Sequence, residues 1–256
     1  MRLDAYLYKI GAYSSRNKAS EGIRRGEVSL NGKIALKSSV EVGDNDDISI
    51  SKNEDFVSNG GYKLEKALSD FDLNVENLTF ADIGASTGGF TDCLLRRGAR
   101  FVYAIDVGES LLSKDLKADE RVKVIDNFNA RYLDEHTLGE KTDGVVCDVS
   151  FISLTYILKP IYDILKDGAV AITLIKPQFE CGKSALNKNG IVTDPNKRVD
   201  AVKKIYDFGK NLGLTPINFT NAPIKSDKNR EYLILWKKSG GDSIDFKYIE
   251  KIIKEI

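Results

Sequence analysis

The sequence predicts an α/β protein: a doubly wound, largely parallel sheet flanked by helices, with a smaller domain before it. From residue 78 onwards, short apolar runs alternate with amphipathic stretches, which is typical of a βαβ series. A glycine-rich turn, Asp82-Ile83-Gly84-Ala85-Ser86-Thr87-Gly88-Gly89, directly follows the first run. The next run ends about twenty residues further on in Asp106, where doubly wound folds place an acid on ribose hydroxyls. Together these features predict a site for a small adenosine-containing ligand.

The composition is consistent with two domains. A chain of 256 residues accommodates an α/β domain of roughly 180 residues plus a small appendage. Because 38 Lys and Arg balance 38 Asp and Glu, any nucleic-acid contact must come from a local basic patch. Cys93, Cys147 and Cys181 are separated and lack C-x-x-C spacing, so we expect reduced and mostly buried thiols. The chain starts without the apolar core of a signal peptide and has only strand-sized apolar runs, which predicts a cytoplasmic protein with no membrane partner.

Residues 1–54 are predicted to form the small domain, with two helices and short strands. Leu3, Leu7 and Ile10 recur at helical spacing, and Ser14 or Ser15 should cap a second helix that runs to Gly26. Alternating apolar residues then predict two strand pairs: Val28 and Leu30 with Ile34 around an Asn31-Gly32 turn, and Val40 and Val42 with Ile48 and Ile50.

Basic side chains gather on the second helix and the loop after it, where a phosphate backbone could lie along them. They are Arg16, Lys18, Arg24, Arg25 and Lys33. The pattern S-R-x-x-A-x-x-x-I-x-x-G-x-V-x-x-N-G from Ser15 to Gly32 resembles the αL RNA-binding domain of a small-subunit ribosomal protein, also found in pseudouridine synthases. The resemblance implies an RNA-binding face; the alternative is an ordinary solvated helix surface.

The polar stretch Ser51–Ser58 is predicted to be a linker, so the larger domain is expected to span residues 55–256. A helix entered through Gly60-Gly61 should pack on the sheet through an apolar side. The strands are expected over residues 78–83, 101–105, 122–126, 144–148, 169–175, 214–219 and 231–236, the last one antiparallel. Helices are expected over 111–116, after 130, and over 154–165 and 199–212, with a C-terminal helix that packs Ile244, Ile249, Ile252, Ile253 and Ile256 in the core.

Glycine spacing distinguishes the possible cofactors. A pyrophosphate-binding turn has the pattern G-x-G-x-x-G, whereas this chain has D-x-G-x-x-x-G-G. The wider turn resembles the nucleotide loop of S-adenosylmethionine-dependent methyltransferases, which have a Rossmann-like fold. The resemblance implies that cofactor contacts come from Asp82, Gly84, Ala85, Ser86, Thr87, Gly88, Gly89, Phe90, Asp106 and Asp148. Asn129, after the third strand, would either contact adenine or cap the next helix.

The same segment also matches a motif of a different enzyme class. Gly84-Ala85-Ser86-Thr87-Gly88 also satisfies the G-x-S-x-G pattern of α/β-hydrolases, in which Ser86 would be the nucleophile. That fold requires a histidine late in the chain, yet the sequence contains only His136, which further strands and helices follow. We therefore expect His136 to be a surface residue near the end of a helix.

Charged residues follow two of the predicted parallel strands, whose carboxyl ends meet at one rim of the sheet. Asp148 and Lys176 end such strands, while Lys63 and Glu231 can reach the same rim. These four residues resemble the Lys-Asp-Lys-Glu tetrad of FtsJ-type ribose 2′-O-methyltransferases. The longer matching segments are Gly60–Leu64, Asp82–Cys93, Asn129–Leu133, Asp148–Leu154 and Lys176–Glu180. With the N-terminal pattern, they resemble the TlyA family, historically called hemolysin A, over nearly the whole chain.

This resemblance implies methyl transfer from S-adenosylmethionine to the ribose 2′-hydroxyl of a cytidine in ribosomal RNA. Ribosomal RNA or ribosomal subunits are then the partners, and no metal is needed. Lys176 is the candidate general base: a nearby Lys63 and the cationic sulfonium favour loss of its proton, which an adjacent acid opposes. Asp148 and Glu231 would orient the two lysines. The loop after Lys176, rich in lysine, asparagine and glycine, is placed where substrates bind open α/β sheets.

Three short segments depart from the family pattern and flank the cofactor site; they contain Asn59, Glu109 and Phe128. Two other functions remain as alternatives. The first is a membrane-active hemolysin, which the lack of a long apolar segment disfavours. The second is a catalytically silent module that binds RNA or ribosomes, which the intact tetrad disfavours.

Overall fold

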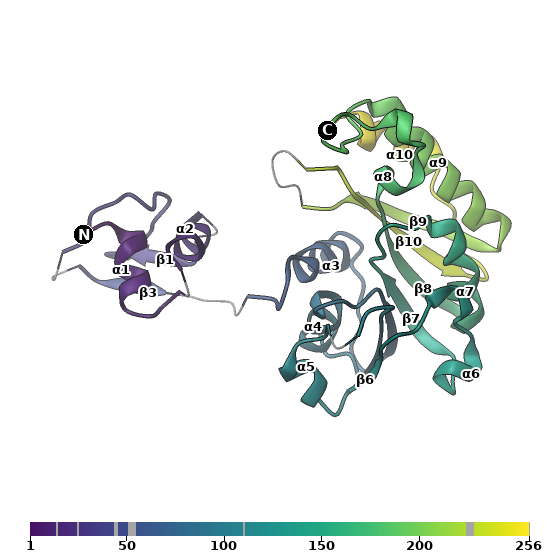
Figure 1. Cartoon of the computed structure of the whole chain (residues 1–256), viewed down its shortest axis with the longest axis horizontal. Coiled ribbons are helices and arrows are strands. Elements are labelled where there is room, and N and C mark those ends of the chain that lie inside the picture. Colours follow the sequence, from purple (N-terminus) through teal and green to yellow (C-terminus); the bar gives the residue numbers. More distant parts are fainter. Residues whose placement is uncertain are drawn as a thin grey trace. The chain divides into compact units, whose positions relative to one another are not determined.

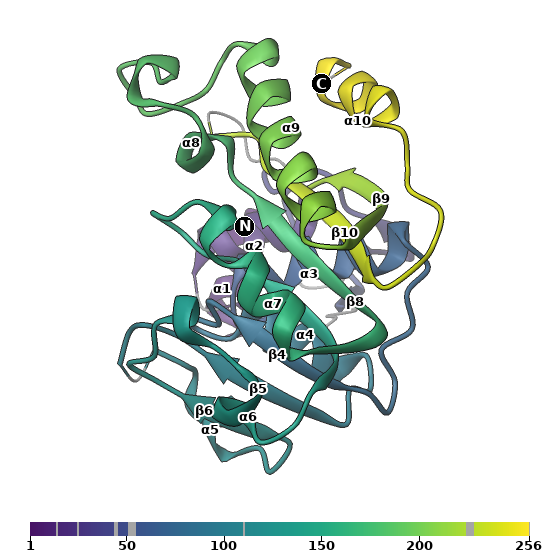
Figure 2. The same ribbon diagram turned by 90° about the vertical axis from the view of Figure 1, so that its right-hand side faces the viewer.

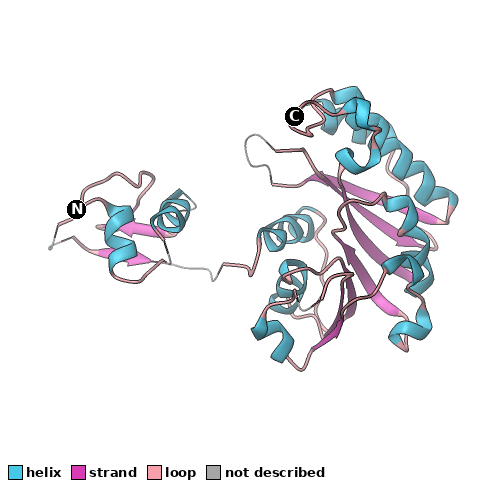
Figure 3. Ribbon diagram, viewed as in Figure 1, coloured by secondary structure: helices cyan, strands magenta, loops and turns pink. Residues whose placement is uncertain are grey.

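The computed structural model describes residues 1–13, 15–24, 26–43, 46–50, 55–109, 111–223 and 228–255. The chain divides into two compact units, Met1–Asp55 and Phe56–Ile256. Figure 1 labels their helices and strands, and Figure 3 distinguishes the two kinds of element by colour.

The described residues of the first unit form two helices, α1 (Leu3–Lys9) and α2 (Arg16–Arg24), and an antiparallel sheet of order β2-β1-β3. Its strands are β1 (Val28–Leu30), β2 (Lys33–Ile34) and β3 (Ile48–Ile50). Leu3, Leu7 and Ile23 are fully buried in a common core, whereas Ile10 is 51% exposed because α1 ends one residue before it. Ser15 Oγ accepts a hydrogen bond from the Lys18 backbone N–H at 3.2 Å, so Ser15 caps α2; Ser14 lies outside the described residues.

One of the two predicted strand pairs of this unit is wrong. The Asn31-Gly32 hairpin is confirmed, with Leu30 opposite Lys33. β3 instead pairs with β1, Leu30 lying opposite Ile48, and Val40 and Val42 belong to no strand. Their backbone meets the start of the chain: the Leu3 N–H donates to Val40 O at 2.7 Å, and the Val42 N–H donates to Met1 O at 2.8 Å. The alternation of apolar residues correctly indicated an extended chain here, but it could not identify the segment with which that chain forms hydrogen bonds.

The second unit is built on a seven-stranded sheet of order β6-β5-β4-β7-β8-β10-β9. Its strands are β4 (Thr79–Ile83), β5 (Phe101–Ile105), β6 (Val122–Ile125), β7 (Thr142–Cys147), β8 (Leu165–Ile175), β9 (Leu214–Asn221) and β10 (Tyr232–Lys238). β4 to β8 are parallel, and β10 is antiparallel to both β8 and β9, as predicted for the last strand. The strand order reverses between β4 and β7, and ligands of open α/β sheets bind at such a switch point.

Helices cover both faces of this sheet. Figure 1 shows α3 (Asn59–Asp70), α4 (Gly89–Arg96) and α5 (Lys114–Ala118) on one face, where they share an apolar core. Figure 2 looks onto the other face, which carries α6 (Glu135–Leu138), α7 (Leu158–Ile164), α9 (Pro195–Asn211) and α10 (Phe246–Lys254). Short helices follow the carboxyl ends of strands: η1 (Ala130–Tyr132), η2 (Leu154–Tyr156), α8 (Pro177–Glu180) and η3 (Lys183–Ala185).

The predicted helix over 154–165 is divided into η2 and α7. Pro160 accounts for the division, because it has no N–H with which to continue an α-helix from Tyr156, whereas the first turn of a helix tolerates proline. The predicted helix over 111–116 begins later, as α5 at Lys114. The C-terminal helix packs in the core as expected, with Ile249 and Ile253 fully buried; Ile256 lies outside the described residues.

Two pairs of glycines allow α3 and α4 to lie in close contact: Gly60-Gly61 in α3, and Gly88-Gly89 at the start of α4. A Cβ atom on Gly89 would lie 2.8 Å from the Gly61 nitrogen and 3.1 Å from Gly60 Cα. Ser58 caps α3 by accepting a hydrogen bond from the Gly60 N–H at 3.3 Å. The first turn of α3, which carries Lys63, is therefore fixed against the start of α4 by contacts that only glycine permits.

We expect Gly89→Ala to destabilise this unit by about 1–3 kcal/mol, because the added methyl group overlaps the α3 backbone. Urea denaturation followed by fluorescence measures this directly, since the protein has one tryptophan and Trp236 is buried in this unit. Gly182→Ala is the control: only a side-chain atom at 3.9 Å is near, and we expect a change within about 0.5 kcal/mol. Equal midpoints for Gly89→Ala and wild type would contradict the close contact.

Candidate active site

Strand pairing brings the four predicted catalytic residues together. β8 and β10 align Ile175 with Tyr232, so that Lys176 and Glu231 leave the sheet side by side. Asp148 follows the neighbouring strand β7, and Lys63 comes from α3. Lys63 Nζ lies 2.6 Å from Glu231 Oε2 and 3.7 Å from Asp148 Oδ2, and Lys176 Nζ lies 2.6 Å from Asp148 Oδ1. The tetrad is thus a chain of ion pairs in the order Glu231, Lys63, Asp148, Lys176.

The tetrad is largely shielded from solvent. The Lys176 side chain is 9% exposed, and those of Lys63, Asp148 and Glu231 are 18–21% exposed. Burial works to lower the pKa of Lys63, but attraction to Asp148 and Glu231, with their hydrogen bonds, outweighs it and raises the pKa above its usual range. Lys63 is therefore a fixed cation at neutral pH, and its two carboxylate partners compensate its burial.

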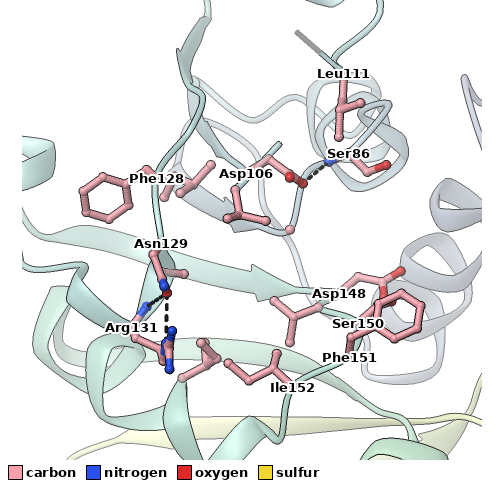
Figure 4. A pocket seen from close by; sticks show the side chains of 16 residues that line it. Ser86, Asp106, Leu111, Phe128, Asn129, Arg131, Asp148, Ser150, Phe151 and Ile152 are labelled. Atoms are coloured by element: carbon pink, nitrogen blue, oxygen red, sulfur yellow. Dashed lines mark hydrogen bonds between the residues drawn. The ribbon is translucent and has the colours of Figure 1, made fainter. Parts of the chain in front are cut away.

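The glycine turn lies between the ends of two strands. The Gly84 and Ala85 N–H groups donate to Ile105 O at 2.9 and 3.1 Å. A Cβ atom on Gly84, whose φ is 82°, would lie 2.7 Å from Asp148 O, so only glycine fits this turn. The Ser86 N–H donates to Asp106 Oδ2 at 2.8 Å, and the Gly108 N–H donates to Asp106 Oδ1 at 2.7 Å. Figure 4 shows the Ser86 contact, which holds the Asp106 carboxylate at the rim.

A cavity of about 450 Å³ opens at this rim, within the size range of small-molecule sites. Its polar lining is Ser86, Asp106, Asn129, Arg131, Asp148 and Ser150, and its apolar lining includes Ile105, Val107, Leu111, Phe128 and Ile152 (Figure 4). Of the predicted cofactor residues, Gly84, Ser86, Asp106, Asn129 and Asp148 line the cavity. Asp82, Ala85, Thr87, Gly88, Gly89 and Phe90 lie outside its lining. Asn129 lines the cavity and also caps η1, because its Oδ1 accepts a hydrogen bond from the Arg131 N–H at 3.1 Å.

Asp82 lies beneath the glycine turn rather than in the cavity wall. Its side chain is fully buried, and Oδ2 accepts a hydrogen bond from Thr91 Oγ1 at 2.7 Å. Burial, opposed by the hydrogen bonds from Thr91 and reinforced by the nearby Asp148 carboxylate, raises the pKa of Asp82 to about 7. Through this hydrogen bond, Asp82 connects β4 to α4 beneath the glycine turn.

The basic residues of the first unit differ in their surroundings. Lys18, Arg24 and Lys33 are exposed. Arg16 is partly engaged within the unit, because its Nη2 donates to the buried Asp4 Oδ2 at 3.0 Å. Arg25 lies outside the described residues.

The structure does not support the hydrolase alternative. His136 is exposed on α6, which precedes the amino end of β7, whereas Ser86 lies at the carboxyl ends of the strands. Two further results concern only the described residues. None of their helices is long and apolar enough to span a bilayer. They also contain no group of three or more His, Cys, Asp or Glu side chains placed to hold a metal ion.

The sheet order, the cavity at the switch point and the charged rim define a Rossmann-like methyltransferase domain. Residues 56–239 match the FtsJ-like methyltransferase family, and residues 1–48 match the S4 domain. The chain belongs to the FtsJ-like methyltransferases, within the family of hemolysin A and TlyA. Both the fold class and the resemblance predicted from the sequence are thereby confirmed.

Three relatives illustrate the family. Hemolysin A of Brachyspira hyodysenteriae is 43% identical, over 91% of this chain and 98% of its own length. The 16S/23S rRNA (cytidine-2′-O)-methyltransferase TlyA of Mycobacterium tuberculosis is 36% identical, over 94% of this chain and 91% of its own. The solved structure of a candidate hemolysin from Streptococcus thermophilus is 35% identical, with a TM-score of 0.75, and the match covers 100% of this chain and 94% of that one.

The raised pKa of Asp82 predicts a pH-dependent stability. Between about pH 4 and pH 7 the folded protein retains a proton that the unfolded chain releases, so the free energy of unfolding decreases as pH rises through this window. Asp82→Asn cannot ionise and avoids this loss. We therefore expect wild type to lose on the order of 1–4 kcal/mol relative to Asp82→Asn between pH 4 and pH 8.

Urea denaturation at several pH values, followed through Trp236, provides the measurement. A stability difference between the two proteins that stays constant over this range would show that Asp82 does not change charge within it.

Proposed function

We propose that this protein transfers the methyl group of S-adenosylmethionine to the ribose 2′-hydroxyl of a cytidine in ribosomal RNA. The observation that carries the proposal is the ion-pair chain of Lys63, Asp148, Lys176 and Glu231, which shares Asp148 with the cavity wall. The name of the Mycobacterium tuberculosis relative supports the nucleotide and the reaction. Ribosomal RNA or a ribosomal subunit is then the partner, which would place the protein in the cytoplasm.

The cavity fits S-adenosylmethionine in size and in the chemistry of its lining. The Asp106 carboxylate, held by two backbone N–H groups, can accept hydrogen bonds from the ribose hydroxyls. Phe128 and Ile152 offer apolar surface for adenine, beside the polar Asn129. We infer direct contacts from Gly84, Ser86, Asp106, Asn129 and Asp148. The remaining predicted residues, Asp82, Ala85, Thr87, Gly88, Gly89 and Phe90, would act by shaping the turn.

The chemistry requires an acceptor for one proton and a means of alignment. When bound, S-adenosylmethionine supplies a methyl group on a cationic sulfur, which keeps the electron pair of the broken bond when the methyl joins the ribose 2′-oxygen. Lys176 Nζ takes the hydroxyl proton. Lys63, kept cationic by Glu231, holds Asp148 in place.

The first unit would hold the RNA. Lys18, Arg24 and Lys33 are exposed and would contact phosphates. Arg25 is a further basic residue of this segment of the sequence. Arg16 would contact RNA only through the guanidinium nitrogens that do not bind Asp4. We infer that the boundary between RNA binding and catalysis lies near residue 55, with residues 1–54 and 55–256 as the functional domains.

Lys176→Ala tests the general base. We expect methyl transfer to isolated ribosomal subunits to fall by roughly 10²–10⁴-fold, because no group remains to take the hydroxyl proton. Labelled S-adenosylmethionine reports the transfer, and resistance of one cytidine linkage to alkaline hydrolysis identifies the 2′-O-methyl product. Isothermal titration should give an unchanged cofactor affinity. Lys159→Ala is the matched control, since Lys159 is an exposed α7 lysine paired with Asp163.

Three outcomes would contradict parts of this proposal. Full activity of Lys176→Ala would remove Lys176 as the base. Cofactor binding by wild type without transfer to either subunit or to naked RNA would indicate a different acceptor. Absence of cofactor binding would favour a catalytically silent RNA-binding protein.

Asp106→Ala tests the cofactor site separately. We expect S-adenosylmethionine to bind about 10- to 100-fold more weakly, because hydrogen bonds to a charged carboxylate are lost. Affinity for RNA should stay unchanged. Asp163→Ala removes an exposed carboxylate of α7 and serves as the control. Cofactor affinity equal to that of wild type would show that Asp106 does not contact the cofactor.

A further inference from the structure

The proposed base has a second close neighbour besides Asp148. Lys176 Nζ donates a hydrogen bond to Ser150 Oγ at 2.7 Å. Ser150 lies two residues beyond Asp148 on the loop that follows β7, and it lines the same cavity. The nitrogen of Lys176 is therefore held from two sides by residues of one loop.

Two neighbours matter because of the geometry of a neutral amine. A neutral lysine nitrogen carries two N–H bonds and one lone pair, and only the lone pair can accept a proton. Held only by attraction to the Asp148 carboxylate, the amine could rotate about its bond to Cε, and the lone pair would take many directions. When Ser150 Oγ accepts one N–H and the Asp148 carboxylate lies beside the nitrogen, the directions open to the lone pair are restricted. Orientation of a reacting group in this way raises the rate without strengthening substrate binding.

We propose that Ser150 is a positioning residue, which orients the neutral amine of Lys176 towards the ribose hydroxyl. The inference rests on the proposed role of Lys176 as general base and adds a residue to that site. Ser150 itself gains or loses no proton in the reaction.

The loop that carries Ser150 is held in place at its far end. The Glu180 side chain is only 1% exposed, and its carboxylate accepts hydrogen bonds from Ser153 Oγ at 2.6 Å and from the Leu154 N–H at 2.8 Å. Lys204 pairs with the same carboxylate at 3.1 Å. Glu180 is the last residue of α8, and Lys176 is the N-cap of the same helix. One short helix therefore contacts the loop twice, once at each end.

The backbone of the loop is also strained beside Ser150. Phe151 has a φ of 63°, a left-handed conformation that costs free energy for any residue other than glycine. Its ring packs against Phe179 of α8, with the ring centroids 5.0 Å apart. Phe151 is 90% exposed, so this ring contact ties the loop beside Ser150 to the helix that follows Lys176 without burying the loop.

The test compares Ser150→Ala with Ser150→Thr in single-turnover methyl transfer to ribosomal subunits. We expect Ser150→Ala to slow transfer by roughly 10- to 100-fold, while the affinities for S-adenosylmethionine and RNA stay within about twofold of wild type. Ser150→Thr keeps a hydroxyl, and because position 150 is exposed, the extra methyl group has room. It should recover the rate to within about threefold. Ser243→Ala, at an exposed serine before α10, is the control and should match wild type.

Each outcome decides the proposal. A Ser150→Ala rate equal to that of wild type, with Lys176→Ala inactive, would overturn the role of Ser150 and leave the base assignment intact. A rate loss in both Ser150 variants accompanied by weaker cofactor or RNA binding would make Ser150 a binding residue instead. Full activity of Lys176→Ala would overturn both the base assignment and the inference built on it.

Discussion

The shared contact of Asp148 with two lysines is the interaction on which the site depends. This carboxylate forms ion pairs with Lys63 of α3 and with Lys176, which follows β8. Lys63 also forms an ion pair with Glu231, which precedes β10. Four separate segments of the chain therefore meet through charges that are largely shielded from solvent. Removing one partner would leave another charge buried without compensation, which is far more costly than losing an exposed ion pair. The fold and the chemistry consequently constrain the same few residues.

Asp148 also connects the charged rim to the glycine turn. Its carbonyl oxygen occupies the space that a side chain on Gly84 would need, and its side chain lines the cavity. The paired glycines of α3 and α4 bring Lys63 towards the same turn from the other side. Close backbone contacts, rather than long side chains, thus set the separation between the cavity wall and the charged rim.

Much of this arrangement could be predicted from the sequence, because apolar runs locate strands and the carboxyl ends of parallel strands must converge. That rule brought Asp148 and Lys176 together. It could not reveal Ser150 or Glu180, since a polar residue in a loop has no periodicity and its partner depends on loop geometry. The sequence also could not separate Asp82, buried beneath the turn, from the residues that line the cavity. Val40 and Val42 show the converse limit, because alternation does not specify which segment an extended chain will meet.

The position of β10 has a consequence for the order in which the protein becomes competent. This strand is the last of the seven in the chain, yet it lies between β8 and β9 in the sheet. Glu231 immediately precedes β10, so the ion-pair partner of Lys63 is synthesised together with the strand that completes the sheet. A growing chain has the basic helix, the glycine turn and Asp106 long before β10 emerges. During synthesis the helices of the first unit, the glycine turn and Asp106 therefore exist first, and the chain of ion pairs is complete only when the last strand inserts.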